Sequence, residues 1–88
     1  MMKCLITGPT SGLGLETTKA LAKLGYDLIL IGRSKNKLNS LKTSLITEYN
    51  CAVDTYTCDL SLITETIQTA KKIKDKYTEI DVLINNAG

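Results

Sequence analysis

The 88 residues suffice for one small domain, and no apolar run among them approaches the roughly 18 residues that a membrane span needs. The formal charge of +2 gives no reason to expect nucleic acid, and the densest basic run, residues 71–76, has the pattern of a solvated helix face. The chain contains no histidine, which excludes a zinc site and a histidine-based catalytic triad.

The three cysteines, Cys4, Cys51 and Cys58, are odd in number and form no Cys-x-x-Cys pair. This usage is typical of reduced thiols and not of a disulfide framework or a metal site. The N-terminus also lacks a separate apolar signal segment, because the first apolar run leads straight into a glycine-rich loop. We therefore expect a cytoplasmic protein without a metal and with neither nucleic acid nor membrane as a partner.

The first predicted unit is a strand, a glycine-rich loop and a helix. Residues 4–7 are apolar enough for a short buried strand, and the loop after them contains three glycines. Residues 12–24 predict a helix, which Gly25 ends in the usual C-terminal position. The residues expected on the inward face of this helix are Leu13, Thr17, Ala20, Leu21 and Leu24.

The second unit begins with residues 28–31, a run that is apolar on both faces, as a parallel strand covered by helices requires. Ser34 is a plausible N-cap for the next helix, and Asn50 can close it. The apolar residues of this helix recur at helical spacing, at Leu38, Leu41, Leu45 and Tyr49. Residues 52–58 then predict a less apolar strand, which suits the edge of a sheet.

The third helix is predicted to begin after Ser61, its expected N-cap, with Asp59 as the alternative cap. Its expected inward residues are Ile63, Ile67, Ala70, Ile73 and Tyr77. Residues 81–84 form a fourth strand, and Asn-Asn-Ala-Gly follows at residues 85–88.

Strands and helices thus alternate from the first strand to the fourth. This alternation predicts an α/β fold, a Rossmann-like doubly wound parallel sheet in the strand order 3-2-1-4 with right-handed crossovers. Residues 1–88 would be the N-terminal part of such a domain, because the sheet normally continues beyond its fourth strand. We expect the outer edge of that strand, and part of the sheet face beside it, to be bare.

The glycine-rich loop, with Gly8, Gly12 and Gly14, is the first candidate site. Glycine lets the backbone turn sharply and approach a ligand closely, and the N–H groups of the helix behind it favour a phosphate. A glycine triplet alone is weak evidence, but here it lies between a strand and a helix of one β-α-β unit. We therefore expect a phosphate-binding loop. The pattern lacks the Gly-Lys-Ser/Thr of nucleoside-triphosphate loops.

The end of the second strand indicates which dinucleotide binds. NAD sites place an acidic residue about 20 positions after the glycines, and here that place holds Gly32. Arg33, the only arginine, follows at once, and its guanidinium suits a ribose 2′-phosphate. We therefore expect NADP(H), with NAD(H) as the alternative, and include Arg33 and Ser34 in the cofactor site. The bland alternative is a surface arginine.

Two more segments lie at the carboxyl ends of strands. Asp59 could accept a hydrogen bond from an adenine amino group, and Leu60 could contact the ring. In Asn-Asn-Ala-Gly, the side-chain amides can tie the loop backbone together, while Ala87 and Gly88 leave room for a ribose. An ordinary turn is the alternative for this second segment.

Together, Thr-Gly-x-x-x-Gly-x-Gly at residues 7–14, Asp59-Leu60 and Asn-Asn-Ala-Gly at residues 85–88 resemble the short-chain dehydrogenase/reductase family over the whole chain. In that family the first motif binds the pyrophosphate, the aspartate contacts adenine, and the last motif supports the sheet and lines the ribose. The resemblance thus implies cofactor contacts for Gly8, Thr10, Ser11, Gly12, Leu13, Gly14, Asp59, Leu60, Asn86, Ala87 and Gly88.

Two departures from the family pattern matter. Arg33 matches the basic residue of NADP-preferring members, but Ser11 replaces a second basic residue often found before the middle glycine. The family's catalytic Tyr-x-x-x-Lys is also absent, because Leu30, Val53, Leu60 and Asp81 lie four residues after the four tyrosines. No residue is therefore assigned to catalysis.

The resemblance implies an oxidoreductase that transfers a hydride between nicotinamide and a carbonyl or alcohol substrate, and a homo-oligomer as its assembled state. The 88 residues would be its NADP(H)-binding part, inactive alone. A non-catalytic nucleotide-binding or assembly module is the second hypothesis. A third and weaker hypothesis is a nucleotide-sugar epimerase of the extended branch of this family, because the glycines of that branch are spaced differently.

Overall fold

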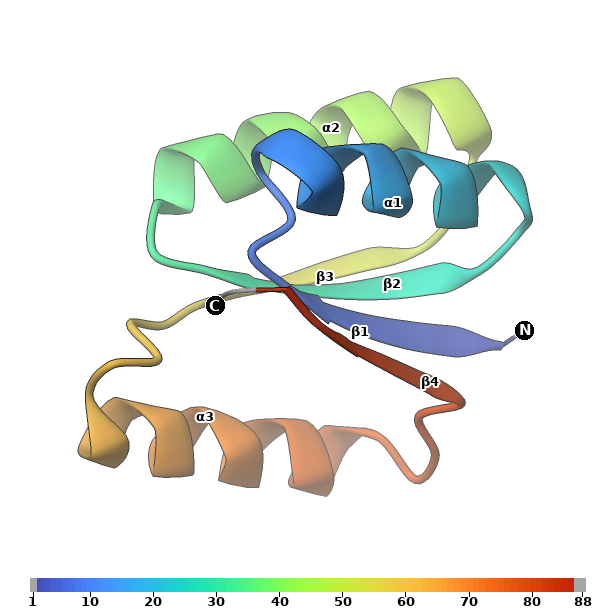
Figure 1. Ribbon diagram of the computed structural model, residues 1–88. Coiled ribbons are helices and arrows are strands. Elements are labelled where there is room, and N and C mark those ends of the chain that lie inside the picture. Colours follow the sequence, from blue (N-terminus) through green and yellow to red (C-terminus); the bar gives the residue numbers. More distant parts are fainter. Residues whose placement is uncertain (1, 87–88) are drawn as a thin grey trace.

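The computed structural model describes residues 2–86, in which four strands alternate with three helices. Their bounds are β1 Lys3–Thr7, α1 Gly12–Lys23, β2 Asp27–Gly32, α2 Lys35–Tyr49, β3 Val53–Thr57, α3 Ile63–Lys76 and β4 Val82–Asn85. All neighbouring strands are parallel, in the order β3-β2-β1-β4. Helices α1 and α2 cover one face of the sheet, and α3 lies on the other (Figure 1). The predicted α/β fold and strand order are confirmed.

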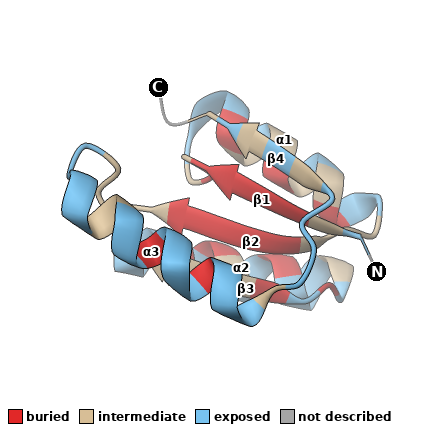
Figure 2. Ribbon diagram, turned by 90° about the horizontal axis from the view of Figure 1, so that it is seen from below, coloured by how far each residue is buried: buried red, intermediate tan, exposed pale blue. Residues whose placement is uncertain are grey.

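The two central strands carry most of the core, as Figure 2 shows by their burial. Because side chains alternate along a strand, each central strand feeds two apolar clusters. Toward α1 and α2, residues such as Cys4, Ile6 and Leu30 pack with Leu38 and Leu45. A smaller cluster on the α3 side consists of Leu5, Ile29, Ile31, Cys58 and Ile73. The sheet is therefore apolar on both faces, as the sequence predicts.

Helix termini follow the predicted chemistry in the first two helices. Gly25 has φ 94°, and the N–H groups of Gly25 and Tyr26 donate to the carbonyls of Ala22 and Leu21, which is a Schellman ending. The hydroxyl of Ser34 accepts a hydrogen bond from the N–H of Lys37, 3.3 Å away, and so caps α2. Asn50 closes α2 in the left-handed conformation.

The predicted inward face of α1 is only partly correct, because Leu21 packs against the core as expected but two of the other leucines do not. Leu13 and Leu24 are 76% and 74% exposed, whereas the buried residues are Gly14, Thr18 and Ala22. These small residues recur every four positions and form one stripe along the helix. They allow the helix backbone to lie close to the sheet, where a row of leucines would hold it away.

The predictions for α3 are also partly wrong. Its N-cap is Leu62, without a side-chain capping bond, and not Ser61 or Asp59. Ile73 is buried and Tyr77 half-buried, as expected, but Ile63, Ile67 and Ala70 are exposed. The apolar residues of α3 do lie along one stripe, but within residues 2–86 nothing covers the N-terminal half of that stripe.

Strand β4 is at the edge of the sheet. It pairs with β1 through the register Leu5↔Leu83, and within residues 2–86 no strand lies on its other side. Leu83 is 68% exposed. The predicted bare edge is thus present in the described part of the chain. Among these residues, no helix has the length and apolar character needed to cross a lipid bilayer.

Candidate nucleotide-binding site

A cavity of about 830 Å³ opens at the carboxyl ends of β1, β2 and β3. In open parallel sheets, this is the end at which ligands bind. The cavity brings together most of the residues that the sequence predicts for the site: Gly8, Thr10, Ser11, Arg33, Ser34, Asp59, Leu60 and Asn86.

The other predicted residues lie elsewhere. Gly12 and Leu13 begin α1 beside the cavity without lining it, and Gly14 is buried beneath the loop. Ala87 and Gly88 lie outside the described residues. Gly12 and Gly14 therefore shape the loop, and the cavity itself is lined by their neighbours.

The glycines of the loop serve different geometric purposes. Gly8 and Gly12 have φ angles of 65° and 56°, in the left-handed region that favours glycine. Gly14 is needed for space, because a Cβ there would collide with the carbonyl oxygen of Gly8 and the side-chain amide of Asn86. The loop can thus fold tightly over the start of α1.

The N-terminus of α1 is positioned to receive an anion. Ser11 is its N-cap and has extended backbone, but its side chain makes no capping bond. The N–H groups of the first turn are therefore not satisfied by a cap, and they carry the positive end of the helix dipole. Ser11 and Thr10 also line the cavity and add two hydroxyl groups to this end.

Asn85, the last residue of β4, and Asn86 after it hold the loop in place, as the sequence predicts. The side-chain amide of Asn86 donates to the carbonyl of Gly8 over 3.1 Å. The hydroxyl of Thr7 donates to Oδ1 of Asn85 at 3.1 Å and accepts from the backbone N–H of Asn86 at 2.9 Å. Residues almost 80 positions apart thus fix one side of the cavity.

Asp59 forms a tight turn after β3. Its Oδ1 accepts hydrogen bonds from the hydroxyl of Ser61, at 2.7 Å, and from the N–H of Ser61, at 3.0 Å. These two bonds, and more weakly the positive charge of Arg33, lower the pKa of the Asp59 carboxyl despite some desolvation. Asp59 therefore remains ionised at neutral pH as an acceptor at the cavity wall.

The cavity also has a basic side that the sequence predicted only in part. Arg33 and Ser34 lie there, and so does Lys37 from the first turn of α2. Residues that line the cavity without having been predicted are Ile31, Gly32, Lys37, Cys58 and Ser61. Lys37 could have been found from its position three residues after the capping serine, because the first turn of a helix lies beside its N-cap.

Comparison with known proteins identifies the family. A model of the short chain dehydrogenase family matches residues 3–88. The very-long-chain 3-oxoacyl-CoA reductase of Vanderwaltozyma polyspora is 38% identical over 86 residues, which cover 97% of this chain and 24% of the reductase. The chain spans about a quarter to a third of the length of the curated relatives it matches, for example 29% of one and 36% of another.

Solved structures give the same result. A short-chain dehydrogenase from Sphingobium yanoikuyae in complex with NADPH matches with a TM-score of 0.91 and 33% identity, covering 100% of this chain and 34% of that one. An NAD⁺-bound xylitol dehydrogenase matches with a TM-score of 0.88 and 30% identity, covering 99% of this chain and 33% of that one. Because the family model matches almost every residue, this chain belongs to the short-chain dehydrogenase family.

Proposed function

We propose that this chain is the NADP(H)-binding part of a short-chain oxidoreductase and that its cofactor binds in the cavity at the carboxyl ends of β1, β2 and β3. The observation that carries the proposal is the collection of positive charge at one side of this cavity. Arg33, Lys37 and the N-terminus of α2 meet there, beside the hydroxyl of Ser34.

Without a bound anion, this arrangement of positive charge is unfavourable for the N-terminus of α2. The first turn of α2 contains Lys35 and Lys37 and no acidic residue, although a helix N-terminus favours negative charge. A bound phosphate would offset that cost and accept hydrogen bonds from the guanidinium of Arg33. The 2′-phosphate distinguishes NADP(H) from NAD(H), so these residues favour NADP(H).

The remaining wall suits the other parts of a dinucleotide. The open N-terminus of α1, with Thr10 and Ser11, would hold the pyrophosphate. The ionised carboxylate of Asp59 would accept from the adenine amino group, and Leu60 would contact the ring. Asn86, with Ala87 and Gly88 after it in the sequence, would lie near a ribose. When bound, the cofactor supplies or accepts the hydride in reactions of carbonyl and alcohol substrates.

The solved relatives support a nicotinamide dinucleotide but not one choice between the two. The Sphingobium enzyme is in complex with NADPH, an alcohol dehydrogenase from Thermococcus sibiricus is complexed with 5-hydroxy-NADP, and the xylitol dehydrogenase is NAD⁺-bound. The preference for NADP(H) therefore rests on the basic side of this chain's own cavity.

The 88 residues contain no Tyr-x-x-x-Lys sequence, so we propose that they bind the cofactor without turning it over. Incubation of the chain with NADPH and a panel of aldehydes and ketones should leave the NADPH absorbance unchanged. Measurable oxidation of NADPH that depends on the carbonyl compound would contradict this part of the proposal.

Titration of the chain with NADPH and with NADH, followed by the fluorescence of the reduced nicotinamide, tests the binding. We expect NADPH to bind at least about tenfold more tightly, because one charge-assisted contact to a phosphate has roughly that effect. The variant Arg33→Ala should lose most of this difference, whereas Lys23→Ala, a lysine in the last turn of α1, should keep it. Equal binding of both cofactors by the unmodified chain would overturn the NADP(H) preference.

A further inference from the structure

The turn between β3 and α3 contributes Asp59, Leu60 and Ser61 to the wall of the candidate cavity. Loops are ordinarily the mobile part of a binding site, because fewer contacts hold them than hold strands and helices. An N-cap side chain at the start of the following helix often fixes such a turn. The N-cap of α3 is Leu62, whose apolar side chain makes no capping bond. The geometry of this turn must therefore be fixed by other residues.

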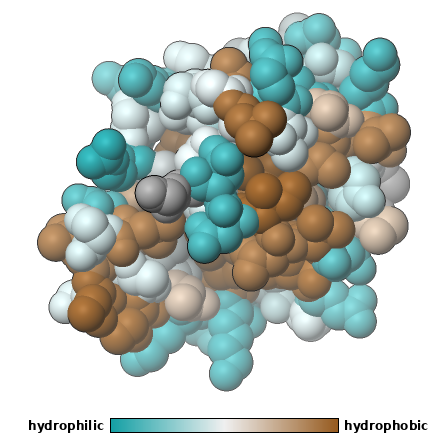
Figure 3. Space-filling view, in the orientation of Figure 1, coloured by the Kyte–Doolittle hydropathy of each residue, from teal (hydrophilic) through white to brown (hydrophobic). Residues whose placement is uncertain are grey.

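Apolar packing does not anchor the start of α3 either. Leu62 and Ile63 are 50% and 77% exposed, and neither belongs to the apolar clusters of the core. Figure 3 shows hydrophobic surface at the lower left of the molecule, where Figure 1 places the N-terminal end of α3. In the described part of the chain, the start of α3 therefore depends on hydrogen bonds for its connection to the turn.

Glu65, in the first turn of α3, reaches back to that turn. Its Oε1 accepts a hydrogen bond from the backbone N–H of Asp59 over 3.2 Å, in a partly buried position. An acidic residue at this place in a helix normally accepts from the N–H of the N-cap residue. Here the N–H of Leu62 already donates to the carbonyl of Asp59 at 3.0 Å. Glu65 is thus bonded to a residue of the cavity wall.

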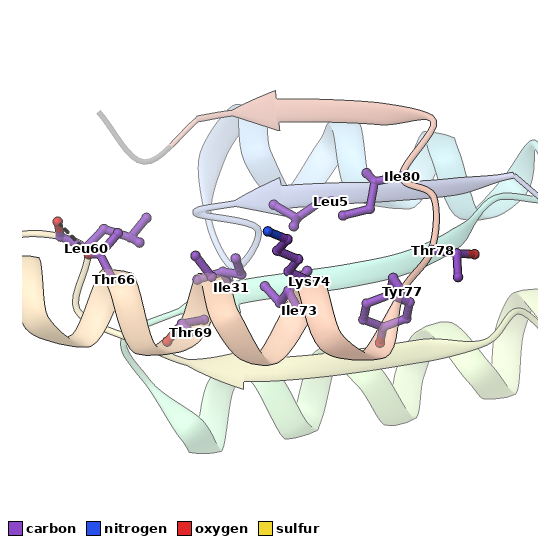
Figure 4. Close-up of a pocket in the computed structure, with 11 residues that line it drawn as sticks. Leu5, Ile31, Leu60, Thr66, Thr69, Ile73, Lys74, Tyr77, Thr78 and Ile80 are labelled. Atoms are coloured by element: carbon purple, nitrogen blue, oxygen red, sulfur yellow. Dashed lines mark hydrogen bonds between the residues drawn. The ribbon is translucent and has the colours of Figure 1, made fainter.

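Thr66 supports the next residue of the turn. Its hydroxyl lies 3.3 Å from the carbonyl oxygen of Leu60 and 2.9 Å from that of Leu62, and it donates toward both. Leu60 lines the candidate cavity and also an apolar groove of about 410 Å³ between α3 and the sheet, where Figure 4 shows it beside Thr66. The first turn of α3 therefore contacts the backbone of two consecutive residues in the cavity wall.

These bonds fix the direction of the Asp59 carboxylate. The backbone N–H of Asp59 is bonded to Glu65, and its carbonyl accepts from Leu62. Oδ1 accepts from both the N–H and the hydroxyl of Ser61, which leaves Oδ2 without a hydrogen bond from the described residues. An acceptor that is already oriented loses little conformational freedom when a ligand binds to it.

We propose that Glu65 is a positioning residue for adenine recognition. Glu65 does not line the cavity, but its hydrogen bond holds Asp59 where the carboxylate can meet the amino group of an adenine. The inference rests on the proposed function, in which Asp59 accepts from that amino group. The hydrogen bond of Glu65 matters here and not its charge, because the N–H of Asp59 needs only an acceptor oxygen.

Two dinucleotides that differ only in the base test this role. One is NADP⁺, and the other is its hypoxanthine analogue, which has a carbonyl oxygen in place of the adenine amino group. Isothermal titration calorimetry should show that the unmodified chain binds NADP⁺ roughly tenfold more tightly, because the carbonyl oxygen cannot donate to Asp59. Glu65→Ala should reduce this preference to about twofold or less, by weakening the binding of NADP⁺ and not that of the analogue.

Two further variants separate the hydrogen bond from other effects of Glu65. Glu65→Gln keeps the acceptor oxygen and removes the charge that favours the N-terminus of a helix, so it should keep the preference for adenine. Glu48→Ala removes an exposed carboxylate in the last turn of α2, away from the cavity, and should also keep it. Circular dichroism checks that each variant is folded.

Hydrogen exchange without nucleotide tests the contact itself. The amide of Asp59 should exchange at least about tenfold faster in Glu65→Ala than in the unmodified chain, and Glu65→Gln should retain the protection. Unchanged exchange at this amide in Glu65→Ala would overturn the inference.

The titrations give three further outcomes that would overturn it. These are the same base preference in Glu65→Ala as in the unmodified chain, an equal loss of preference in Glu65→Gln and Glu65→Ala, and an unmodified chain that binds both dinucleotides equally. A chain that binds neither dinucleotide would instead contradict the proposed function, and this inference with it. The failure of the inference alone is thus distinguishable, because the chain then still binds NADP⁺.

Discussion

Lys37 lines the candidate site although the sequence analysis did not predict it there. Before the middle glycine of the loop, the chain has Ser11, where the family pattern expected for NADP-preferring members has a basic residue. In the structure, the first turn of α2 brings Lys37 to the same cavity as Arg33. A second positive charge is thus present, but it comes from another element.

Removal of this charge should weaken NADP⁺ binding selectively. We predict that Lys37→Ala raises the Kd for NADP⁺ by about threefold to tenfold, as expected for one partly exposed charged contact, and leaves the Kd for NAD⁺ unchanged. Isothermal titration calorimetry with both cofactors measures this. Lys23→Ala is the control. A similar loss of affinity for both cofactors would show that Lys37 acts on the fold and not on the phosphate.

Gly14 is the second residue on which the site depends. Its position is inside α1, where alanine is ordinarily favoured over glycine by roughly 1 kcal/mol. A Cβ here would collide with the carbonyl of Gly8, which is backbone and cannot move aside. We predict that Gly14→Ala lowers the free energy of unfolding by about 1–3 kcal/mol, the usual cost of overpacking.

Urea unfolding measures this prediction, and Thr17→Ala on the same helix is the control because Thr17 lies outside the buried stripe. Gly12→Ala provides a useful contrast. A Cβ at Gly12 meets no atom within 4 Å, so its cost comes only from the left-handed φ of 56°. A Gly14→Ala chain as stable as the unmodified one would contradict the close packing of α1 under the loop.

At the scale of elements, α3 is fastened to the sheet at its C-terminal end. The hydroxyl of Tyr77 donates a hydrogen bond to Asp54 of β3, and Nζ of Lys76 lies 3.1 Å from the same carboxylate. Partial burial alone would raise the pKa of the Asp54 carboxyl, but the hydrogen bonds from Tyr77 and Lys76 outweigh it and hold this pKa below its ordinary value. The pKa of the Tyr77 hydroxyl is raised by burial and by Asp54.

This contact predicts a small pH dependence of stability. A carboxylate whose pKa is lower in the folded state contributes stability above its unfolded pKa, about 3.9 for aspartate. That contribution is lost as the pH falls from there through the folded pKa. We therefore expect the free energy of unfolding to fall more between pH 5 and about pH 3 in the unmodified chain than in Asp54→Asn.

Denaturant unfolding across this range is the measurement. The difference should be below about 1 kcal/mol, because the side chain of Asp54 is 39% exposed and solvent screens its ion pair. Asp75→Asn, on the exposed side of the same helix, is the control. Identical pH profiles for Asp54→Asn and the unmodified chain would show that this contact does not stabilise α3.

The elements show what the sequence can and cannot predict. The helix ends at Ser34, Asn50 and Gly25 depend on neighbouring backbone only, and the structure confirms them, whereas the predicted cap of α3 is wrong. The inward faces of α1 and α3 depend on what packs against them. The small buried stripe of α1 is hidden in a pattern that also contains exposed leucines, and the stripe of α3 extends beyond the surface that the described residues cover.

In the candidate site, too, features set by the local sequence were predicted better than features set by packing. Residues at strand ends, such as Arg33 and Asp59, line the cavity, and their order in the chain is enough to place them at the carboxyl ends of the strands. Lys37 was missed because only the residues next to the strand end were considered, although its place in the first turn after the N-cap Ser34 puts it beside them. Gly12 and Gly14 do not line the cavity, and the structure shows that both shape the loop; their contact with a cofactor stays a prediction.

For the whole molecule, the cofactor proposal concerns one boundary of a small sheet, the carboxyl ends of its strands. The cavity at the carboxyl ends of the strands is the proposed cofactor site, and the apolar groove beside α3 is a second opening in the described residues. A cofactor that fills the cavity should therefore stabilise the folded chain. A ligand that binds only the folded chain raises its unfolding temperature by mass action.

The most direct test of the cofactor proposal is thermal unfolding of this chain over a concentration series of NADP⁺ and, separately, of NAD⁺. At about 100 times the Kd, binding adds about 2.7 kcal/mol of stability. For a domain of this size, that raises Tm by roughly 10 °C or more. We predict such a rise with NADP⁺ at concentrations where NAD⁺ has little effect. A clear unfolding transition that neither cofactor shifts would contradict the proposal that this chain forms a nucleotide-binding site.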